Sequence, residues 1–279
     1  MTFLESIILG FAQGLSEFLP ISSSGHLALL EYFFGIDEDR VLAFAALLHL
    51  GTLFSIFFVY YREIGALLLE LCAVFRDIFT GRGLRVNACE TRRLGFMIIV
   101  ATVPTAIIGL LLKDLFSGLY NSLAAIGVGL LITGCVLIFS ERAAKGAKNV
   151  YDIGFRHAFF IGIMQSVALC PGISRSGATI AGSLFSGMKR EFAVRFAFLI
   201  SIPSVIGAII LEAPEAFGAG VEGAMLPALG AGIVVSTLSG FFAIKTMIRV
   251  VSKGKLRYFS FYTWIVGAAV IVYAVITLS

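Results

Sequence analysis

Charged residues, histidine and paired cysteines are scarce in this sequence. Charged residues make up 14% of the 279 residues and hydrophobic residues 59%, a balance typical of integral membrane proteins rather than of soluble domains. Three histidines are too few for a histidine-rich metal centre. The four cysteines form no Cys-x-x-Cys pair, so neither a zinc site nor a disulfide framework is indicated. The basic residues are not interleaved with aromatic ones, which argues against a nucleic-acid partner.

Long apolar runs make up most of the chain. A helix needs roughly 20 residues to cross about 30 Å of hydrocarbon, and six runs are long enough: residues 41–60, 94–112, 121–140, 191–211, 225–248 and 258–278. We therefore predict an all-α polytopic membrane protein with six transmembrane helices in contact with membrane lipids. Residues 64–80 are predicted to form either an amphipathic helix on the cytoplasmic surface or an extra half-span.

Two further apolar stretches, residues 3–19 and 155–170, run into polar breaks that contain glycine, proline and serine. A short apolar piece follows each break, at residues 27–34 and 178–185. Irregular backbone at membrane depth is tolerated only where it lines a cavity or is buried in protein. Each stretch is therefore predicted to form a re-entrant helical hairpin rather than a span.

The two breaks repeat one another at an offset of 152 residues. The matching pairs are Gln13 with Gln165, Ile21 with Ile173, Ser22 with Ser174, Ser24 with Ser176, and Gly25 with Gly177. Each half would hold one hairpin and three crossings, and an odd number of crossings inverts the second half. We predict an inverted-topology repeat, with residues 1–140 as the first half and 150–279 as the second, together forming one membrane domain.

Lysine and arginine predict the orientation of the chain. They crowd into loops 61–93, 141–156, 186–190 and 249–257, whereas the loops of the opposite side carry only Arg40 and Lys113. By the positive-inside rule the crowded side is cytoplasmic. We expect a multi-pass protein of the cell's inner (plasma) membrane with both termini extracytoplasmic. Because Arg40 is the first basic residue, the N-terminus lacks the basic region of a signal peptide and is expected to stay on the mature protein.

Each break carries one charged residue, Glu17 in the first and Arg175 in the second. A charge at the bilayer centre costs about 2.5–3.5 kcal/mol on insertion scales, so such residues indicate a function. A structural ion pair between them is the alternative. Free N–H groups at helix N-termini attract anions, and an arginine fork matches phosphate oxygens. Two such helix ends together with Arg175 predict a cradle for a phosphate or diphosphate group at membrane depth.

The repeat places Ser23 opposite Arg175, so the two halves differ at the centre of the predicted pocket. His26 follows Ser23 by one helical turn and is expected to reach either Ser23 or a leaving phosphate oxygen. A serine nucleophile, a histidine proton carrier and a carboxylate are the groups that phosphate-ester hydrolysis requires. Ser22 and Ser24 fit helix capping and substrate binding equally well.

Two other polar residues within the predicted spans receive no catalytic role. His49, in "LLHLGTL", is interpreted as a satisfied intramembrane histidine. Arg195, near the cytoplasmic end of its span, is interpreted as a snorkelling or pairing residue.

The motifs "QGLSEFLPISSSGHL" (13–27) and "PGISRSGAT" (171–179) closely resemble those of the undecaprenyl-diphosphate phosphatase family, also called bacitracin resistance proteins. The resemblance extends to "LLHLGTL" and "REFAVRFAFLISIP" and covers essentially the whole chain. It implies an integral membrane hydrolase that removes the terminal phosphate of undecaprenyl diphosphate and so regenerates the lipid carrier for cell-wall synthesis. It also implies dependence on a divalent cation, Mg²⁺ or Ca²⁺, and a homodimer.

On this chain the resemblance implies catalytic roles for Glu17, Ser23, His26 and Arg175, with Glu17 also a metal ligand. The substrate-binding residues are expected to be Gln13, Ser22, Ser24, Gly25, Gly172, Ser174, Ser176 and Thr179. Two positions depart from the family pattern. Gln13 leaves Glu17 as the only carboxylate in its element, which argues against a two-carboxylate metal site. Thr263 stands where relatives carry arginine, which argues against a phosphate contact from the last helix.

A transporter is the competing class of function, because inverted repeats with broken helices also serve alternating access. On that interpretation the protein flips a lipid phosphate or carries an anion, and the polar breaks bind without catalysis. A membrane-embedded scaffold, the third class, explains the hydroxyl-rich breaks poorly. Phosphate release from a polyprenyl diphosphate distinguishes the enzyme from the transporter.

Overall fold

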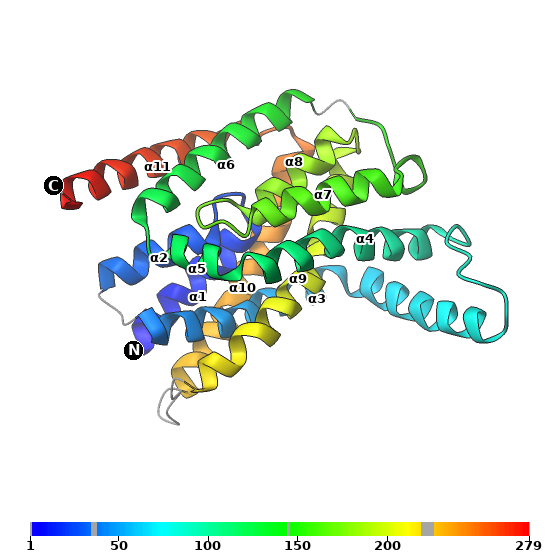
Figure 1. Ribbon diagram of the computed structural model, residues 1–279, viewed down its shortest axis with the longest axis horizontal. Helices are drawn as coiled ribbons and strands as arrows, with labels where there is room; N and C mark the ends of the chain where they lie inside the picture. The colour runs from blue at the N-terminus through cyan, green and yellow to red at the C-terminus, as the bar shows by residue number, and fades with distance from the viewer. Residues whose placement is uncertain (1, 35–37, 144–145, 219–225, 279) are drawn as a thin grey trace.

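The computed structural model describes residues 2–34, 38–143, 146–218 and 226–278, which are almost entirely helical (Figure 1). In chain order the helices are α1 (Phe3–Phe18), α2 (Ser23–Phe34), α3 (Glu38–Phe79), α4 (Glu90–Leu111), α5 (Lys113–Tyr120), α6 (Leu123–Ala143), the 3-10 helix η1 (Val150–Asp152), α7 (Phe155–Val167), α8 (Arg175–Phe185), α9 (Arg190–Gly218), α10 (Leu226–Ser252) and α11 (Arg257–Leu278). The predicted all-α class is confirmed.

Six segments of these helices are long and apolar enough to cross a membrane: Leu47–Phe79, Glu90–Leu111, Leu123–Ala143, Arg190–Leu211, Leu226–Ser252 and Arg257–Thr277. Large apolar side chains stay exposed on them, for example Phe58 at 63% and Ile265 at 71%, as expected of a surface that faces lipid. The protein is therefore a multi-pass membrane protein with the six predicted spans. Both termini lie at one end of the bundle, and the connection between α3 and α4 lies at the other (Figure 1).

Helix α3 bends at Tyr60, where the backbone leaves helical angles (φ −111°, ψ 26°) and two helices join across a kink. The helix after the kink ends at Phe79 and so covers nearly all of residues 64–80. Its far end is held by buried Arg92 of α4, which donates to Asp77 at 2.8 Å and to Glu70 at 2.9 Å. A helix is therefore present where the sequence predicted one, and its place on the cytoplasmic surface or as an extra half-span stays a prediction.

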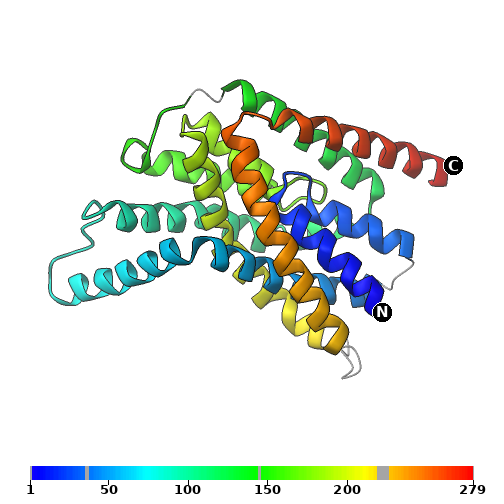
Figure 2. The same ribbon diagram turned by 180° about the vertical axis from the view of Figure 1, so that it is seen from behind.

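Both predicted breaks interrupt the helices where the sequence placed them. The first separates α1 from α2 at residues 19–22, and the second separates α7 from α8 at residues 168–174. In Figure 2, α1 runs inward from the N-terminal end of the molecule, and α2 runs back from the break toward that same end. The insertion of each hairpin into one side of the bilayer stays a prediction, as do the repeat boundaries at 1–140 and 150–279.

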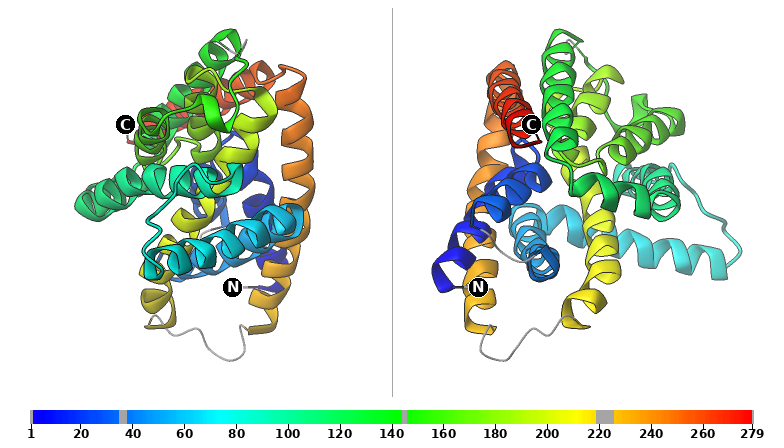
Figure 3. Two further views of the ribbon diagram at one scale, coloured as in Figure 1. Left: turned by 90° about the vertical axis from the view of Figure 1, so that its right-hand side faces the viewer. Right: turned by 60° about the vertical axis from the view of Figure 1, so that its left-hand side comes forward.

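Small residues bring α1 and α10 into close contact (Figure 3). A Cβ atom on Gly10 would lie 2.4 Å from the carbonyl oxygen of Gly232, and one on Gly14 would lie 2.3 Å from that of Ser236. Small residues spaced four apart are what lets membrane helices approach so closely. Glu17 lies one turn beyond Gly14, so this contact positions its side chain.

An aromatic contact supports the end of α1 from inside the bundle. Phe18 of α1 and Phe198 of α9 are both 1% exposed, and their rings meet edge to face at a centroid distance of 5.5 Å. Edge-to-face pairs add about 0.5–1.5 kcal/mol beyond the burial of their apolar area. The residue next to Glu17 is thereby anchored in the largest apolar core.

Candidate active site

The first break ends one helix and starts another through Pro20 and Ser22. Pro20 has no N–H to continue the hydrogen bonding of α1, and the helix ends at Phe18. Ser22 has a φ of +71°, a left-handed conformation uncommon for a residue with a side chain. Its Oγ accepts the N–H of Gly25 at 3.2 Å. Ser22 thus caps α2, the capping role that the sequence left open for it.

The second break has the same design. Ser174 caps α8, because its Oγ accepts the N–H of Gly177 at 3.1 Å, while its own N–H donates to Thr133 Oγ1 of α6 at 3.0 Å. Gly172 has a φ of +82°, and a Cβ there would lie 2.2 Å from the carbonyl oxygen of Ile126. Only glycine fits both the conformation and the space. Position 172 therefore requires glycine because of its backbone conformation and the lack of space for a side chain.

The two breaks meet although they are far apart in the chain. Ser176 Oγ of α8 donates to the carbonyl oxygen of Leu19 in the first break at 3.2 Å. A Cβ on Gly25 would lie 3.4 Å from Cα of Gly172, so the two glycines also face one another. Arg175 comes within 3.7 Å of Glu17. The structure therefore gathers both motifs into one place.

Glu17 lies at the centre of this cluster and is 7% exposed. Ser23 Oγ donates to its Oε2 at 2.8 Å, and Gln13 Nε2 donates to the same oxygen at 3.3 Å. Nε2 of His49 lies 3.7 Å from Oε2, and Nη1 of Arg175 lies 3.7 Å from Oε1. A carboxylate at this distance from a serine hydroxyl can take its proton. Glu17 therefore lies where a general base for Ser23 would have to lie.

The expected contact between His26 and Ser23 is not the one that the structure makes. His26 Nδ1 lies 2.8 Å from the carbonyl oxygen of Ser22, and Nε2 lies 2.7 Å from the hydroxyl of Tyr262 in α11. Ser23 instead donates to Glu17. Of the two predicted alternatives, the contact with Ser23 is therefore not made. A role of His26 toward the leaving phosphate oxygen stays a prediction.

Three other predicted binding residues, Ser24, Ser176 and Thr179, each bond to a neighbour in their own break or helix. Ser24 Oγ lies 3.1 Å from Ser22 Oγ, and Ser176 Oγ lies 3.2 Å from Ser174 Oγ. Thr179 is 1% exposed, and its hydroxyl donates back to the carbonyl oxygen of Arg175 at 2.9 Å. The side chain of Thr179 therefore stiffens the first turn of α8, and its contact with substrate stays a prediction.

Sequence reasoning missed two residues near the two breaks, one beside Glu17 and one beside His26. His49 of α3 was interpreted only as a satisfied intramembrane histidine, and the structure places it beside Glu17. A histidine inside an apolar run was the signal that could have found it. Tyr262 carried no such signal, since it is one of eight tyrosines. Its neighbour Thr263 is fully buried and donates to the carbonyl oxygen of Ser260 at 3.1 Å within α11.

Arg175 keeps hydrogen-bond donors available. Its 3.7 Å separation from Glu17 is too long for a hydrogen bond. Its Nε and Nη1 atoms are buried and have no hydrogen-bond partner among the described residues. Buried donors in proteins are normally bonded, and an arginine fork at a helix N-terminus suits phosphate oxygens. The structural ion pair exists, yet it leaves the guanidinium free to bind an anion.

The oxygen atoms around Glu17 fit a divalent cation that is shared with substrate. Among the residues that the structure describes, no group of three or more His, Cys, Asp or Glu side chains could hold a metal ion. Gln13 donates from Nε2 to the Glu17 carboxylate, and its Oε1 is buried without a hydrogen-bond partner in the described part of the chain. Mg²⁺ commonly takes one or two carboxylates and completes its shell with water and substrate phosphate. Glu17 and Gln13 meet that requirement, whereas a two-carboxylate site has no second carboxylate here.

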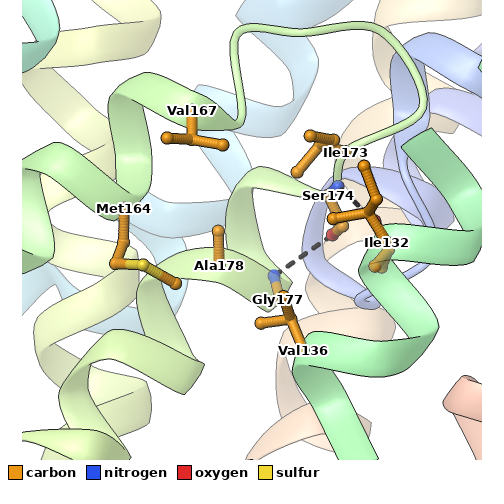
Figure 4. Close-up of a pocket in the computed structure, with 9 residues that line it drawn as sticks. Ile132, Val136, Met164, Val167, Ile173, Ser174, Gly177 and Ala178 are labelled. Atoms are coloured by element: carbon orange, nitrogen blue, oxygen red, sulfur yellow. Dashed lines mark hydrogen bonds between the residues drawn. The ribbon is translucent and has the colours of Figure 1, made fainter. Parts of the chain in front are cut away.

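A shallow groove with room for about 30 Å³ lies behind the second break (Figure 4). Its lining comes from α6, α7, α8 and the break itself: Ile132, Thr133, Val136, Met164, Val167, Ile173, Ser174, Gly177 and Ala178. The side chains are mostly apolar, and no residue of the first break contributes. The groove is therefore distinct from the polar cluster, which it adjoins at Ser174.

Comparison with known proteins agrees with these motifs. The family model described as "Bacitracin resistance protein BacA" matches residues 6–269. The chain is 48% identical to the undecaprenyl-diphosphatase of Alkaliphilus metalliredigens, over 99% of this chain and 100% of the relative. It is 43% identical to that of Desulforapulum autotrophicum, over 96% of each chain, and 40% identical to that of Carboxydothermus hydrogenoformans, over 98% and 97%. The chain belongs to the bacitracin resistance protein BacA family.

Proposed function

We propose that this protein is a membrane phosphatase that hydrolyses undecaprenyl diphosphate to undecaprenyl phosphate and inorganic phosphate, recycling the lipid carrier for cell-wall synthesis. The observation that carries the proposal is the placement of Ser23 and Arg175 on either side of Glu17, at 2.8 Å and 3.7 Å. One break thus supplies a hydroxyl in contact with a base, and the other supplies a cation with free donors. Relatives that share at least 40% identity bear the name undecaprenyl-diphosphatase.

In the proposed mechanism Arg175 binds the terminal phosphate of the diphosphate, and the N–H groups that begin α2 and α8 contribute their dipoles. Glu17 takes the proton of Ser23, whose Oγ forms a bond to the terminal phosphorus. The bond from that phosphorus to the bridging oxygen breaks, and the lipid monophosphate leaves. Water then hydrolyses the phosphoserine. A simpler variant lets Glu17 or His26 activate a water that attacks the phosphorus directly.

Glu17 and Gln13 are the residues that would hold a Mg²⁺ or Ca²⁺ ion. When bound, such an ion supplies positive charge that offsets the charge developing on the diphosphate oxygens. On this proposal Arg175 and the two helix N-termini bind the phosphate as well.

The substrate enters, on this proposal, from the outer leaflet of the inner (plasma) membrane, with its prenyl tail remaining in lipid. The basic loops would lie in the cytoplasm and both termini outside it, in keeping with the clustering of lysine and arginine. The apolar groove beside α8 adjoins the phosphate cradle at Ser174. A homodimer is part of the proposal.

The proposal is tested by phosphate release from undecaprenyl diphosphate by the purified protein, with and without EDTA. We expect each protein molecule to release many phosphate ions, and we expect the rate of release to fall when EDTA removes divalent cations. Movement of the lipid across liposomes without any phosphate release would contradict the phosphatase and favour the transporter.

A further inference from the structure

The contact between His26 of α2 and Tyr262 of α11 joins the first break to the last helix. Nε2 of His26 and the hydroxyl oxygen of Tyr262 are 2.7 Å apart, and the two rings are nearly parallel, with an interplanar angle of 12° and centroids 5.7 Å apart. Neither partner belongs to the cluster of bonds around Glu17. The contact therefore has to be explained separately.

The bond on the other side of the ring determines which nitrogen carries the proton. Nδ1 lies 2.8 Å from the carbonyl oxygen of Ser22, and a carbonyl oxygen can only accept a hydrogen bond. Nδ1 must therefore be the protonated nitrogen. The lone pair of neutral His26 is then on Nε2, and the hydroxyl of Tyr262 donates to it. If His26 gains a proton, Nε2 donates and the same hydroxyl accepts, so the contact survives both states.

The geometry points to Tyr262 as a positioning residue of the phosphatase reaction, one that holds the His26 ring with Nε2 as its proton-accepting atom. A single bond from Nδ1 to Ser22 allows the ring to tilt about that bond. A second bond at the opposite edge of the ring, together with the parallel contact of the two rings, restrains the tilt. Tyr262 is 42% exposed, and the inference requires its hydroxyl to give way to water or a phosphate oxygen at Nε2.

Helix α2 meets α11 differently from the way in which α8 meets α6. Helix α8, from the second half of the chain, packs closely on α6. Its counterpart α2 is joined to α11 by side-chain pairs, His26 with Tyr262 and Tyr32 with Tyr273. The hydroxyl groups of Tyr32 and Tyr273 are 3.2 Å apart. The second pair links the same two helices without touching His26 and so provides a matched control.

The inference rests on the proposed function, and a double-mutant cycle tests it in the purified full-length protein. Tyr262→Phe keeps the ring and removes the hydroxyl. We expect kcat for phosphate release to fall about 3- to 10-fold, the worth of one neutral hydrogen bond, with KM changed less than about 2-fold. In a His26→Ala background the same substitution should change kcat by less than about 2-fold, because residues acting through one another are not additive. Tyr273→Phe should leave kcat unchanged.

Equal losses from Tyr262→Phe with and without His26 would overturn the inference, as would a Tyr262→Phe variant with the kcat of the unmodified protein. A second readout does not depend on activity. The chain has three histidines, so ¹⁵N-histidine NMR with His26→Ala for assignment reports the protonated nitrogen directly. We expect protonated Nδ1 at His26 in both proteins, and a shifted Nε2 resonance in Tyr262→Phe, because Nε2 loses the hydrogen bond from the Tyr262 hydroxyl. An unchanged spectrum would overturn the inference even if the protein released no phosphate.

Discussion

Replacing Glu17 with glutamine should remove its ability to take a proton from Ser23 while keeping its hydrogen bond with Ser23. The amide is nearly the same size as the carboxylate, so Ser23 keeps a hydrogen-bond acceptor at its position 2.8 Å away. The amide cannot accept a proton from Ser23, and it presents no negative charge to Arg175 or His49, each 3.7 Å from a Glu17 oxygen. Phosphate binding should therefore persist while the chemical step fails.

The size of the loss follows from the role of a general base. Proton transfer by a positioned side chain contributes about 10²–10⁴-fold to a reaction rate, and the 2.8 Å contact between Ser23 and Glu17 is within the distance that such transfer requires. We expect kcat of Glu17→Gln to fall by about 10²–10⁴-fold. Because Arg175 loses a competing negative charge, KM for the diphosphate should stay level or fall.

The assay is steady-state phosphate release by purified variants of equal thermal stability in detergent. Glu5→Gln is the matched control, since Glu5 is on the same helix and its carboxylate accepts the N–H of Thr2 at 2.8 Å, far from the cluster. Glutamine can accept the same bond, so this variant should keep full activity. A Glu17→Gln variant that retains more than about a tenth of the kcat would refute the assignment of Glu17 as base.

Three further predictions concern the nucleophile, the cation and the packing of α1. Ser23→Ala should lose the phosphoserine that acid quenching traps with ³²P-labelled substrate and at least about 10²-fold in kcat; substantial turnover without any trapped phosphoserine would leave only the direct attack of water. EDTA should lower turnover and added Mg²⁺ or Ca²⁺ restore it, whereas full activity in EDTA would remove the cation from the mechanism. Gly14→Ala should lower stability by about 1–3 kcal/mol through overpacking, because its Cβ would lie 2.3 Å from the carbonyl oxygen of Ser236. The control is Gly65→Ala, which has nothing within 4 Å, and equal thermal unfolding of the two variants would contradict the close contact of α1 with α10.

The six spans and the two breaks could be predicted from the sequence, because each depends on local composition. A run of about 20 apolar residues is read directly from the chain, and Pro20 and Gly172 mark the places where a helix cannot continue. The pairing of Glu17 with Arg175 was also within reach, since two charges in apolar surroundings need partners. These features require little knowledge of how the helices pack.

The remaining contacts of the site depend on that packing. The partner of His26 is set by the conformation of Ser22 and by the position of α11, neither of which a local pattern reveals. His49 reaches Glu17 because α3 passes beside the end of α1. The bond from buried Arg92 of α4 to Asp77, which ties the far end of α3 to α4, likewise depends on packing.

Phosphate release from undecaprenyl diphosphate by the purified protein and by its Arg175→Ala variant tests most directly whether the two breaks form one phosphatase site. Arg62→Ala is the control, because Arg62 is exposed and its guanidinium contacts Tyr61. We expect the unmodified protein and Arg62→Ala to release phosphate equally, and Arg175→Ala to lose about 10²–10³-fold in kcat at unchanged thermal stability. Release by Arg175→Ala at the rate of the unmodified protein would contradict the account, and so would a failure of the unmodified protein to release phosphate.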